Sequence, residues 1–259
     1  MDKLFLTALL MGMSVSGIYA QKATIEPTFT EWHDLQVNAV NRFATHTNFF
    51  AFAPNENLRG TKYDMKKSAN YLSLDGDWKF NWVENADQRP TDFFRTDFDD
   101  SQWKTFPVPG IWEVNGYGDP VYVNIGFAWR GNFKNNPPEV PIKENHVGSY
   151  RRTIRIPDNW DGKQVIAHFG SVTSCVYLWV NGKFVGYSED SKIGPEFDVT
   201  KFLKKGDNQI AFQVFRWSDG SYCEDQDFWR LSGVARESYL YARDAKQHLK
   251  DIRVTPDLV

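Results

Sequence analysis

The run Val176-Tyr-Leu-Trp-Val-Asn-Gly-Lys-Phe-Val-Gly-Tyr187 decides the fold class, because its pattern is that of two strands joined by a tight turn. Aromatic and β-branched residues, which favour strands, lie on both sides of Asn181-Gly182. Asn-Gly between two such segments favours a type I′ turn, whose twist suits a two-residue β-hairpin. The run therefore predicts an antiparallel hairpin.

Short strand patterns separated by turn residues continue on both sides of this hairpin. The predicted strands cover residues 77–82, 149–156, 164–169, 197–199, 209–217 and 234–241. Within 209–217, Ile210, Phe212 and Val214 are expected on one side of the strand and Ala211, Gln213 and Phe215 on the other. Many short strands without a long amphipathic helix predict an all-β fold, a β-sandwich of the jelly-roll type.

Composition excludes several classes of partner. The 259 residues carry 30 basic and 33 acidic side chains, and this near-neutral balance argues against nucleic acid or an anionic membrane surface as partner. Aromatic residues make up 16% of the chain, which fits either a β-rich core or a carbohydrate-facing surface. Composition alone favours the core.

The first 20 residues have the pattern of a secretory signal peptide. Lys3 gives a basic start, residues 4–13 are apolar, and Ala20 is a small residue before Gln21. No other segment approaches the length that a bilayer requires. We therefore expect an exported protein, periplasmic or secreted, without a membrane span.

The remaining chain divides into three parts. Residues 21–70 lack sustained alternation and are predicted to form an extended N-terminal arm, residues 71–243 the sandwich, and residues 244–259 a linker with the first strand of a further domain, so that the chain looks truncated. Cys175 and Cys223 are expected to be free thiols. With 5 scattered histidines, the two cysteines give no zinc-type spacing.

Residues 216–233, Arg-Trp-Ser-Asp-Gly-Ser-Tyr-Cys-Glu-Asp-Gln-Asp-Phe-Trp-Arg-Leu-Ser-Gly, place four acids among four aromatic side chains. Carboxylates accept hydrogen bonds from several hydroxyls at once, and aromatic rings cover the apolar C–H faces of a sugar ring. This segment is therefore a candidate sugar-binding loop.

An ordered series of motifs carries a family resemblance. The motifs are Trp32 to Arg42, Leu74-Asp-Gly-Asp-Trp78-Lys-Phe80, Asp99 to Trp103, Val108-Pro109, Trp112-Glu113, Gly116-Tyr-Gly-Asp-Pro-Val-Tyr-Val-Asn124, Asn181-Gly182, Val185-Gly-Tyr187, Glu196-Phe-Asp198 and the candidate sugar-binding loop. Together they resemble the N-terminal, sugar-binding portion of glycoside hydrolase family 2, specifically its long-chain β-galactosidases. The likeness spans residues 30–243.

The resemblance implies an enzyme that hydrolyses terminal non-reducing β-D-galactosides with retention. It implies a jelly roll similar to galactose-binding domains, followed by an immunoglobulin-like domain and a barrel that carries two catalytic glutamates and magnesium. No carboxylate pair here matches the motifs of those glutamates, so we expect this chain alone to be inactive. The implied partners are a β-galactoside substrate, the remaining domains of the enzyme and, through the arm, further copies in a homo-oligomer.

Two positions match active-site residues of the family. Asn124 corresponds to an asparagine that reaches the galactosyl ring, and Asp227 to an aspartate that contacts galactose hydroxyls and helps to hold sodium, with the other sodium ligands in the barrel. The alternatives are an ordinary strand-end role for Asn124 and a turn cap or a pair with Arg230 for Asp227. Trp129 and Arg130 depart from the family pattern and are expected to shape the aglycone side.

A different class of function remains open. The chain would instead be a free-standing, non-catalytic galactoside-binding module if the whole ligand site lay within it. A mainly structural role in assembly, with arm residues such as Phe49 and Phe50 at an interface, is compatible with the enzyme hypothesis.

Overall fold

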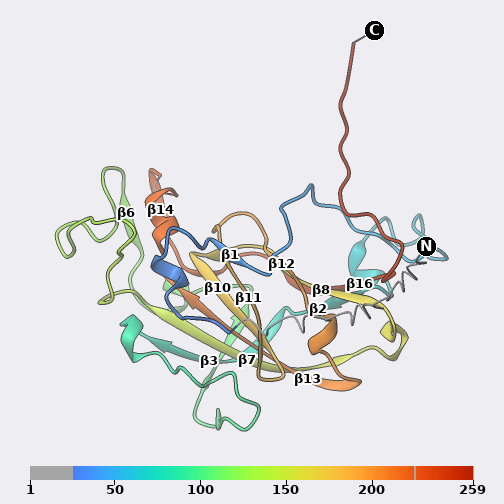
Figure 1. The fold of residues 1–259 in the computed structure, drawn as a ribbon, viewed down its shortest axis with the longest axis horizontal. Coiled ribbons are helices and arrows are strands. Elements are labelled where there is room, and N and C mark those ends of the chain that lie inside the picture. The colour runs from blue at the N-terminus through green and yellow to red at the C-terminus, as the bar shows by residue number, and fades with distance from the viewer. Residues whose placement is uncertain (1–25, 225, 259) are drawn as a thin grey trace, which may run out of the picture.

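The structure is a computed structural model that describes residues 26–224 and 226–258 (Figure 1). The predicted signal peptide, residues 1–20, therefore lies outside the described residues. The described part confirms the predicted all-β fold, since its sheets are antiparallel and its helices are 3-10 turns of three or four residues. These turns are η1 (Glu31–His33), η2 (Met65–Lys67), η3 (Ala86–Gln88), η4 (Glu113–Asn115), η5 (Asp158–Trp160), η6 (Thr200–Phe202) and η7 (Asp219–Tyr222).

The strands of the described chain form two larger sheets and two small ones. In spatial order, the seven-stranded sheet contains β1 (Ala39–Val40), β11 (Lys183–Glu189), β10 (Cys175–Val180), β13 (Gly206–Phe215), β7 (Val147–Ile156), β3 (Gly76–Val83) and β4 (Lys104–Val108). The four-stranded sheet contains β12 (Glu196–Asp198), β8 (Gln164–Phe169), β16 (Ser238–Arg243) and β2 (Tyr71–Ser73). A three-stranded sheet joins β5 (Gly110–Ile111), β15 (Gly233–Val234) and β9 (Val172–Thr173), and a ribbon pairs β6 (Val121–Val123) with β14 (Phe228–Arg230).

Strand β13 lies at the centre of the seven-stranded sheet and is buried on both faces. Its register with β7 is unbroken from Gly206↔Ile156 to Phe215↔Val147. Alternate residues enter two different hydrophobic clusters, Phe212 in one and Phe215 in the other. The alternation predicted for residues 209–217 is thus confirmed.

The predicted hairpin is also confirmed. Strands β10 and β11 pair antiparallel from Cys175↔Glu189 to Val180↔Lys183. Asn181 and Gly182 both have positive φ, 51° and 78°, as a type I′ turn requires.

One predicted strand, residues 234–241, is wrong as a single element. The structure divides it into β15 and β16, which belong to different sheets. The Ala235 amide donates to the Ser171 carbonyl at 2.9 Å, in the register of the β15–β9 pairing, whereas Ser238 already pairs with Phe169 of β8. The chain therefore passes from one sheet to the other between residues 235 and 238.

The arm lies on the sandwich of its own chain. Its short strand β1 forms one edge of the seven-stranded sheet and pairs with β11, Ala39 opposite Ser188. The Trp32 ring stacks on Phe215 with centroids 5.2 Å apart, and the Tyr177 hydroxyl donates to Glu31 Oε2 at 2.9 Å. The described arm residues therefore contribute to the core.

Two further expectations concern the arm and the C-terminal segment of the described chain. Phe50 was expected at an interface between copies, and this stays a prediction; within this chain its ring packs against Phe52, Tyr71 and Tyr241, with centroids 5.1–6.4 Å apart. Residues 250–258 run away from the sandwich, are exposed and take part in no sheet of the described chain (Figure 1). That they begin another domain stays a prediction.

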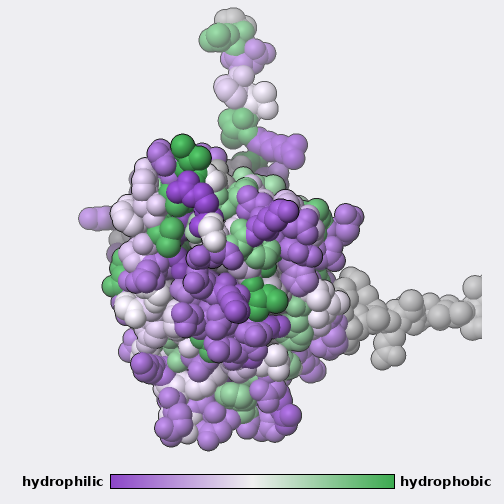
Figure 2. Space-filling view, turned by 90° about the vertical axis from the view of Figure 1, so that its left-hand side faces the viewer, coloured by the Kyte–Doolittle hydropathy of each residue, from purple (hydrophilic) through white to green (hydrophobic). Residues whose placement is uncertain are grey.

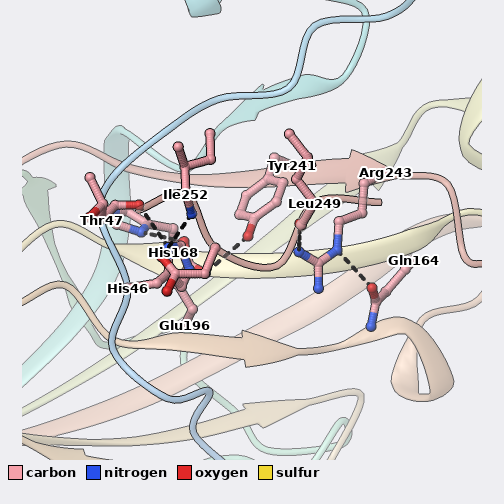
Figure 3. Close-up of polar contacts among 10 residues, drawn as sticks. His46, Thr47, Gln164, His168, Glu196, Tyr241, Arg243, Leu249 and Ile252 are labelled. Atoms are coloured by element: carbon pink, nitrogen blue, oxygen red, sulfur yellow. Dashed lines mark hydrogen bonds and ion pairs between the residues drawn. The ribbon is translucent and has the colours of Figure 1, made fainter. Parts of the chain in front are cut away.

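A cluster of polar side chains, the histidine clamp (His46, His168, Glu196 and Tyr241), fastens the arm to the smaller sheet (Figure 3). Glu196 accepts from a ring nitrogen of His46 at 3.0 Å, from one of His168 at 3.0 Å and from the Tyr241 hydroxyl at 2.9 Å. Burial by itself would raise the Glu196 pKa, but the bonds from His168, His46 and Tyr241 hold it below its usual value. Burial lowers the His46 pKa, yet bonds to the Thr47 carbonyl and to Glu196 bring it above the ordinary value.

The clamp predicts that arm docking weakens as pH rises. Because the folded-state pKa of His46 is raised, its contribution is fully present below the unfolded pKa of about 6.5 and is lost as pH rises through the folded value. Amide hydrogen exchange of residues 43–52 should show a severalfold loss of protection between about pH 5.5 and about pH 8.5. His46→Gln should abolish this pH dependence, whereas His248→Gln, on the C-terminal segment, should not. Equal protection of the unsubstituted arm at both pH values would contradict the prediction.

Candidate functional site

The structure brings Asn124 and Asp227 to the same end of the β6–β14 ribbon. Asn124 directly follows β6, and Asp227 directly precedes β14. The register pairs Val123 with Phe228, so the next position outward on each strand is Asn124 on one and Asp227 on the other. Both side chains are exposed. Two residues that are far apart in the sequence thus become neighbours at one exposed edge.

The ribbon adds two exposed aromatic rings beside this pair. Tyr122 and Trp229 face each other across the strands, 51% and 54% exposed, with ring centroids 5.6 Å apart. The Tyr122 hydroxyl donates to Asp227 Oδ1 at 2.5 Å. This bond, with Asp227's charge, raises the pKa of Tyr122. The ribbon end therefore presents an oriented carboxylate next to an amide and two apolar ring surfaces.

The ribbon lies at one side of the molecule (Figure 1). That side is largely hydrophilic, with a few separate apolar residues rather than one continuous apolar patch (Figure 2). A polar surface with isolated exposed rings suits a polyhydroxylated ligand better than an apolar one.

The loop before Asp227 is fixed at its stem. The Glu224 carboxylate accepts from the Ser191 backbone amide at 2.7 Å and from the Ser191 hydroxyl. The Tyr222 hydroxyl donates to the Glu139 carbonyl at 2.6 Å. Glu224 is thus a structural anchor. Asp225 lies outside the described residues.

On the C-terminal side of Asp227, strand β14 is held by its pairing with β6. Within β14, Arg230 is 8% exposed, donates to the Phe228 carbonyl at 3.3 Å and lies over the Phe228 ring, 4.6 Å from its centroid. The loop is therefore connected to fixed structure on both sides of Asp227.

Trp129 is buried, and its expected role at the aglycone side stays a prediction. It is 4% exposed, packs against Trp217 and Tyr222, and donates from Nε1 to Asn135 Oδ1 at 2.8 Å. Neighbouring Arg130 is exposed. Tyr122 is the residue that sequence reasoning missed, although its position two residues before Asn124 places both on one face of β6.

A cavity of about 920 Å³ lies close to the ribbon but does not contain the predicted residues. Its walls include Trp32, Trp129, Trp217 and Arg216, and it touches the ribbon only at Val121. Neither Asn124 nor Asp227 lines it. The ribbon end is thus an open surface site.

The residues present do not form a complete metal site. Within the described chain, no group of three or more His, Cys, Asp and Glu side chains is arranged to hold a metal ion. Asp227 offers one carboxylate, and Tyr122 already occupies one of its oxygens. Cys175 is buried and Cys223 exposed, and both are free as predicted. Among the described residues, no helix is long and apolar enough to cross a bilayer.

Comparison with known proteins identifies the family. Residues 71–244 match the profile of "Glycosyl hydrolases family 2, sugar binding domain". The chain belongs to glycoside hydrolase family 2. The predicted family resemblance is thereby confirmed, and the profile covers nearly the whole sandwich.

The relatives of this family 2 chain include two bacterial β-galactosidases. The β-galactosidase of Priestia megaterium is 41% identical over 231 residues, which are 89% of this chain and 22% of the relative. That of Lactobacillus delbrueckii subsp. bulgaricus is 40% identical over 225 residues, 87% of this chain and 22% of the relative. The chain thus spans about a fifth of the length of these curated relatives.

A solved structure supports the fold of this family 2 domain. A crystal structure of Bacteroides uniformis β-glucuronidase superposes with a TM-score of 0.50 at 22% identity, over 66% of this chain and 18% of that one. At this identity the likeness concerns the fold alone.

The Tyr122–Asp227 bond gives a prediction that does not depend on any ligand. Because the adjacent carboxylate disfavours a phenolate, Asp227→Asn should lower the pKa of Tyr122 toward the ordinary value of about 10. NMR titration of tyrosines labelled at Cζ, with Tyr122→Phe to assign the signal, measures this pKa. Asp97→Asn, which removes an exposed carboxylate elsewhere, is the control. An unchanged Tyr122 titration in Asp227→Asn would show that the bond is not formed.

Proposed function

We propose that this chain is the sugar-binding region of a retaining β-galactosidase and that the ribbon end contacts the terminal, non-reducing galactose of the substrate. The observation that carries the proposal is the meeting of Asn124 and Asp227 at one exposed ribbon end, with Asp227 oriented by Tyr122. Homology to β-galactosidases over 89% of the chain supports the choice of sugar.

The chemistry of the ribbon end suits a galactosyl group. An ionised carboxylate accepts hydrogen bonds from two hydroxyls, and an amide both donates and accepts. The exposed rings of Tyr122 and Trp229 add apolar area for the C–H face of the sugar. Each hydrogen bond contributes on the order of 1 kcal/mol, so two residues hold a monosaccharide only weakly.

In this proposal the hydrolysis itself takes place elsewhere in a longer protein. The two catalytic glutamates and magnesium would lie in a barrel domain, and this chain alone would not hydrolyse β-galactosides. Asp227 would have two roles. It would supply one ligand of a sodium ion whose other ligands lie in that barrel, and it would accept hydrogen bonds from galactose hydroxyls. Export of the protein after cleavage before Gln21 is part of the proposal, and N-terminal sequencing of the mature protein tests it.

Substitution of Asp227 tests the site directly. In the full-length protein, Asp227→Ala should lower kcat/KM for a nitrophenyl β-galactoside by about ten- to hundredfold, as loss of a hydrogen bond to a charged group would. Any dependence of the rate on sodium should weaken as well. Asp97→Ala is the matched control. Unchanged kinetics in Asp227→Ala would remove Asp227 from the site.

Titration of the 259-residue chain with galactose distinguishes this proposal from a free-standing binding module. Because the ribbon end supplies two hydrogen-bonding residues, calorimetry should detect no binding, or a Kd of about 1 mM or weaker. Binding at about 1 μM or tighter, lost in Asn124→Ala, would instead favour a complete galactoside-binding module.

A further inference from the structure

A pair of buried carboxyl groups lies beneath the loop that carries Asp227. Glu189 ends strand β11, and Asp219 begins η7; they are 7% and 5% exposed. Their carboxyl groups are hydrogen-bonding neighbours. The contact joins the edge of the seven-stranded sheet to the first residue of a loop that reaches Asp227 eight positions later.

The remaining contacts of the pair define where a proton is needed. The Tyr187 hydroxyl donates to Glu189 Oε1 at 2.6 Å, and the Gly220 amide donates to Oε2 at 3.1 Å. Asp219 Oδ1 is buried and accepts no hydrogen bond from any described N–H group or hydroxyl. A buried carboxylate oxygen without a donor is costly, and a proton held between the two carboxyls supplies that donor.

The other ionisable groups around the pair do not neutralise it. Burial raises the pKa of the Cys175 thiol and of the Tyr187 hydroxyl well above their ordinary values, so both are neutral. From the arm, Arg42 donates to the main-chain carbonyl of Glu189 at 3.2 Å rather than to its carboxyl group. Glu31, on η1, adds a further acid on this side and accepts from the Tyr177 hydroxyl.

Two adjacent carboxyl groups in such surroundings do not both ionise at neutral pH, because burial and like charge disfavour the second charge. Burial, followed by the bond to Asp219, raises the pKa of Glu189 to about 8. The folded chain therefore retains a proton that the unfolded chain loses near pH 4.3.

We propose that Glu189 and Asp219 share one proton and that this proton fastens the Asp227 loop to the sandwich. The two side chains are positioning residues for Asp227. The backbone of η7 lies directly on Glu189, since a Cβ atom added at Gly220 would stand 2.6 Å from Glu189 Oε2. Loss of the proton leaves two negative charges buried next to each other and moves η7, with the loop behind it, away from β11. The effect of this proton on catalysis rests on the proposed function. The existence of the shared proton is independent of it.

A variant of nearly the same shape distinguishes the effect of the shared proton from the effect of the side-chain volume. In Glu189→Gln, the amide nitrogen donates to Asp219 and the amide oxygen accepts from one of the two present donors, Tyr187 or Gly220, so the side chain keeps its shape without a titratable proton. Asp219→Asn makes the same replacement of a carboxyl group by an amide on the other member of the pair. Both variants should fold, and the infrared measurement on the unsubstituted protein requires no variant.

Two measurements on the full chain test the proposal. Infrared spectra should contain the carbonyl band of a protonated buried carboxylic acid at neutral pH, lost with a midpoint near pH 8 and missing in Glu189→Gln. Hydrogen exchange of residues 218–224, corrected for intrinsic rates, should lose protection by up to about tenfold per pH unit between the unfolded pKa of about 4.3 and that midpoint, and should level off above it. In Glu189→Gln the protection should not change with pH, and exchange in β7 should serve as the internal control.

Either of two results would overturn the proposal. One is the lack of a protonated-acid band in the unsubstituted protein at about pH 6. The other is the same pH-dependent loosening of residues 218–224 in Glu189→Gln. Because neither readout involves sugar or activity, a failure of galactoside contact at Asp227 would leave these results unchanged.

Discussion

The pairing of β13 along both of its edges is the constraint on which the rest of the structure depends. It is hydrogen-bonded to β7 on one edge and to β10 on the other, and its two faces belong to different hydrophobic clusters. A slip of one residue would exchange those faces and place Gln213 where Phe212 now packs. Each buried large apolar side chain contributes about 1.5–3 kcal/mol, so the native register is strongly favoured.

Elements governed by local chemistry were predictable from the sequence. The hairpin followed from Asn181-Gly182, and the division of the β13 side chains between two faces followed from their alternation. The break between β15 and β16 was not predictable, because the two strands pair with partners in different sheets, which only the tertiary fold determines. The docking of the arm had no local signal for the same reason: its partners lie in strands more than 100 residues away.

For the candidate site as well, the residue types could be predicted from the sequence but their arrangement in space could not. The residue types of the Asp227 loop suggested a sugar site, and family resemblance selected Asn124 and Asp227. Their adjacency comes from the β6–β14 register, which no spacing in the sequence reveals. Burial, which the sequence does not reveal, distinguishes two tryptophans near this site: Trp129 is buried, whereas Trp229 is exposed. The pairing of Glu189 with Asp219 required the fold, because each acid by itself resembles an ordinary loop residue.

The position of β1 has a consequence for how this molecule behaves in a crowded solution. An open sheet edge offers unpaired N–H and C=O groups to any other strand, which leads to intermolecular strand addition and aggregation. Strand β1 covers the exposed edge of β11, and at the opposite edge β4 contains Pro107, which has no N–H to offer. The arm thus covers Tyr187 and Ser188 of β11, and Pro107 leaves β4 with one N–H group fewer, so both borders of the seven-stranded sheet offer less backbone for strand addition.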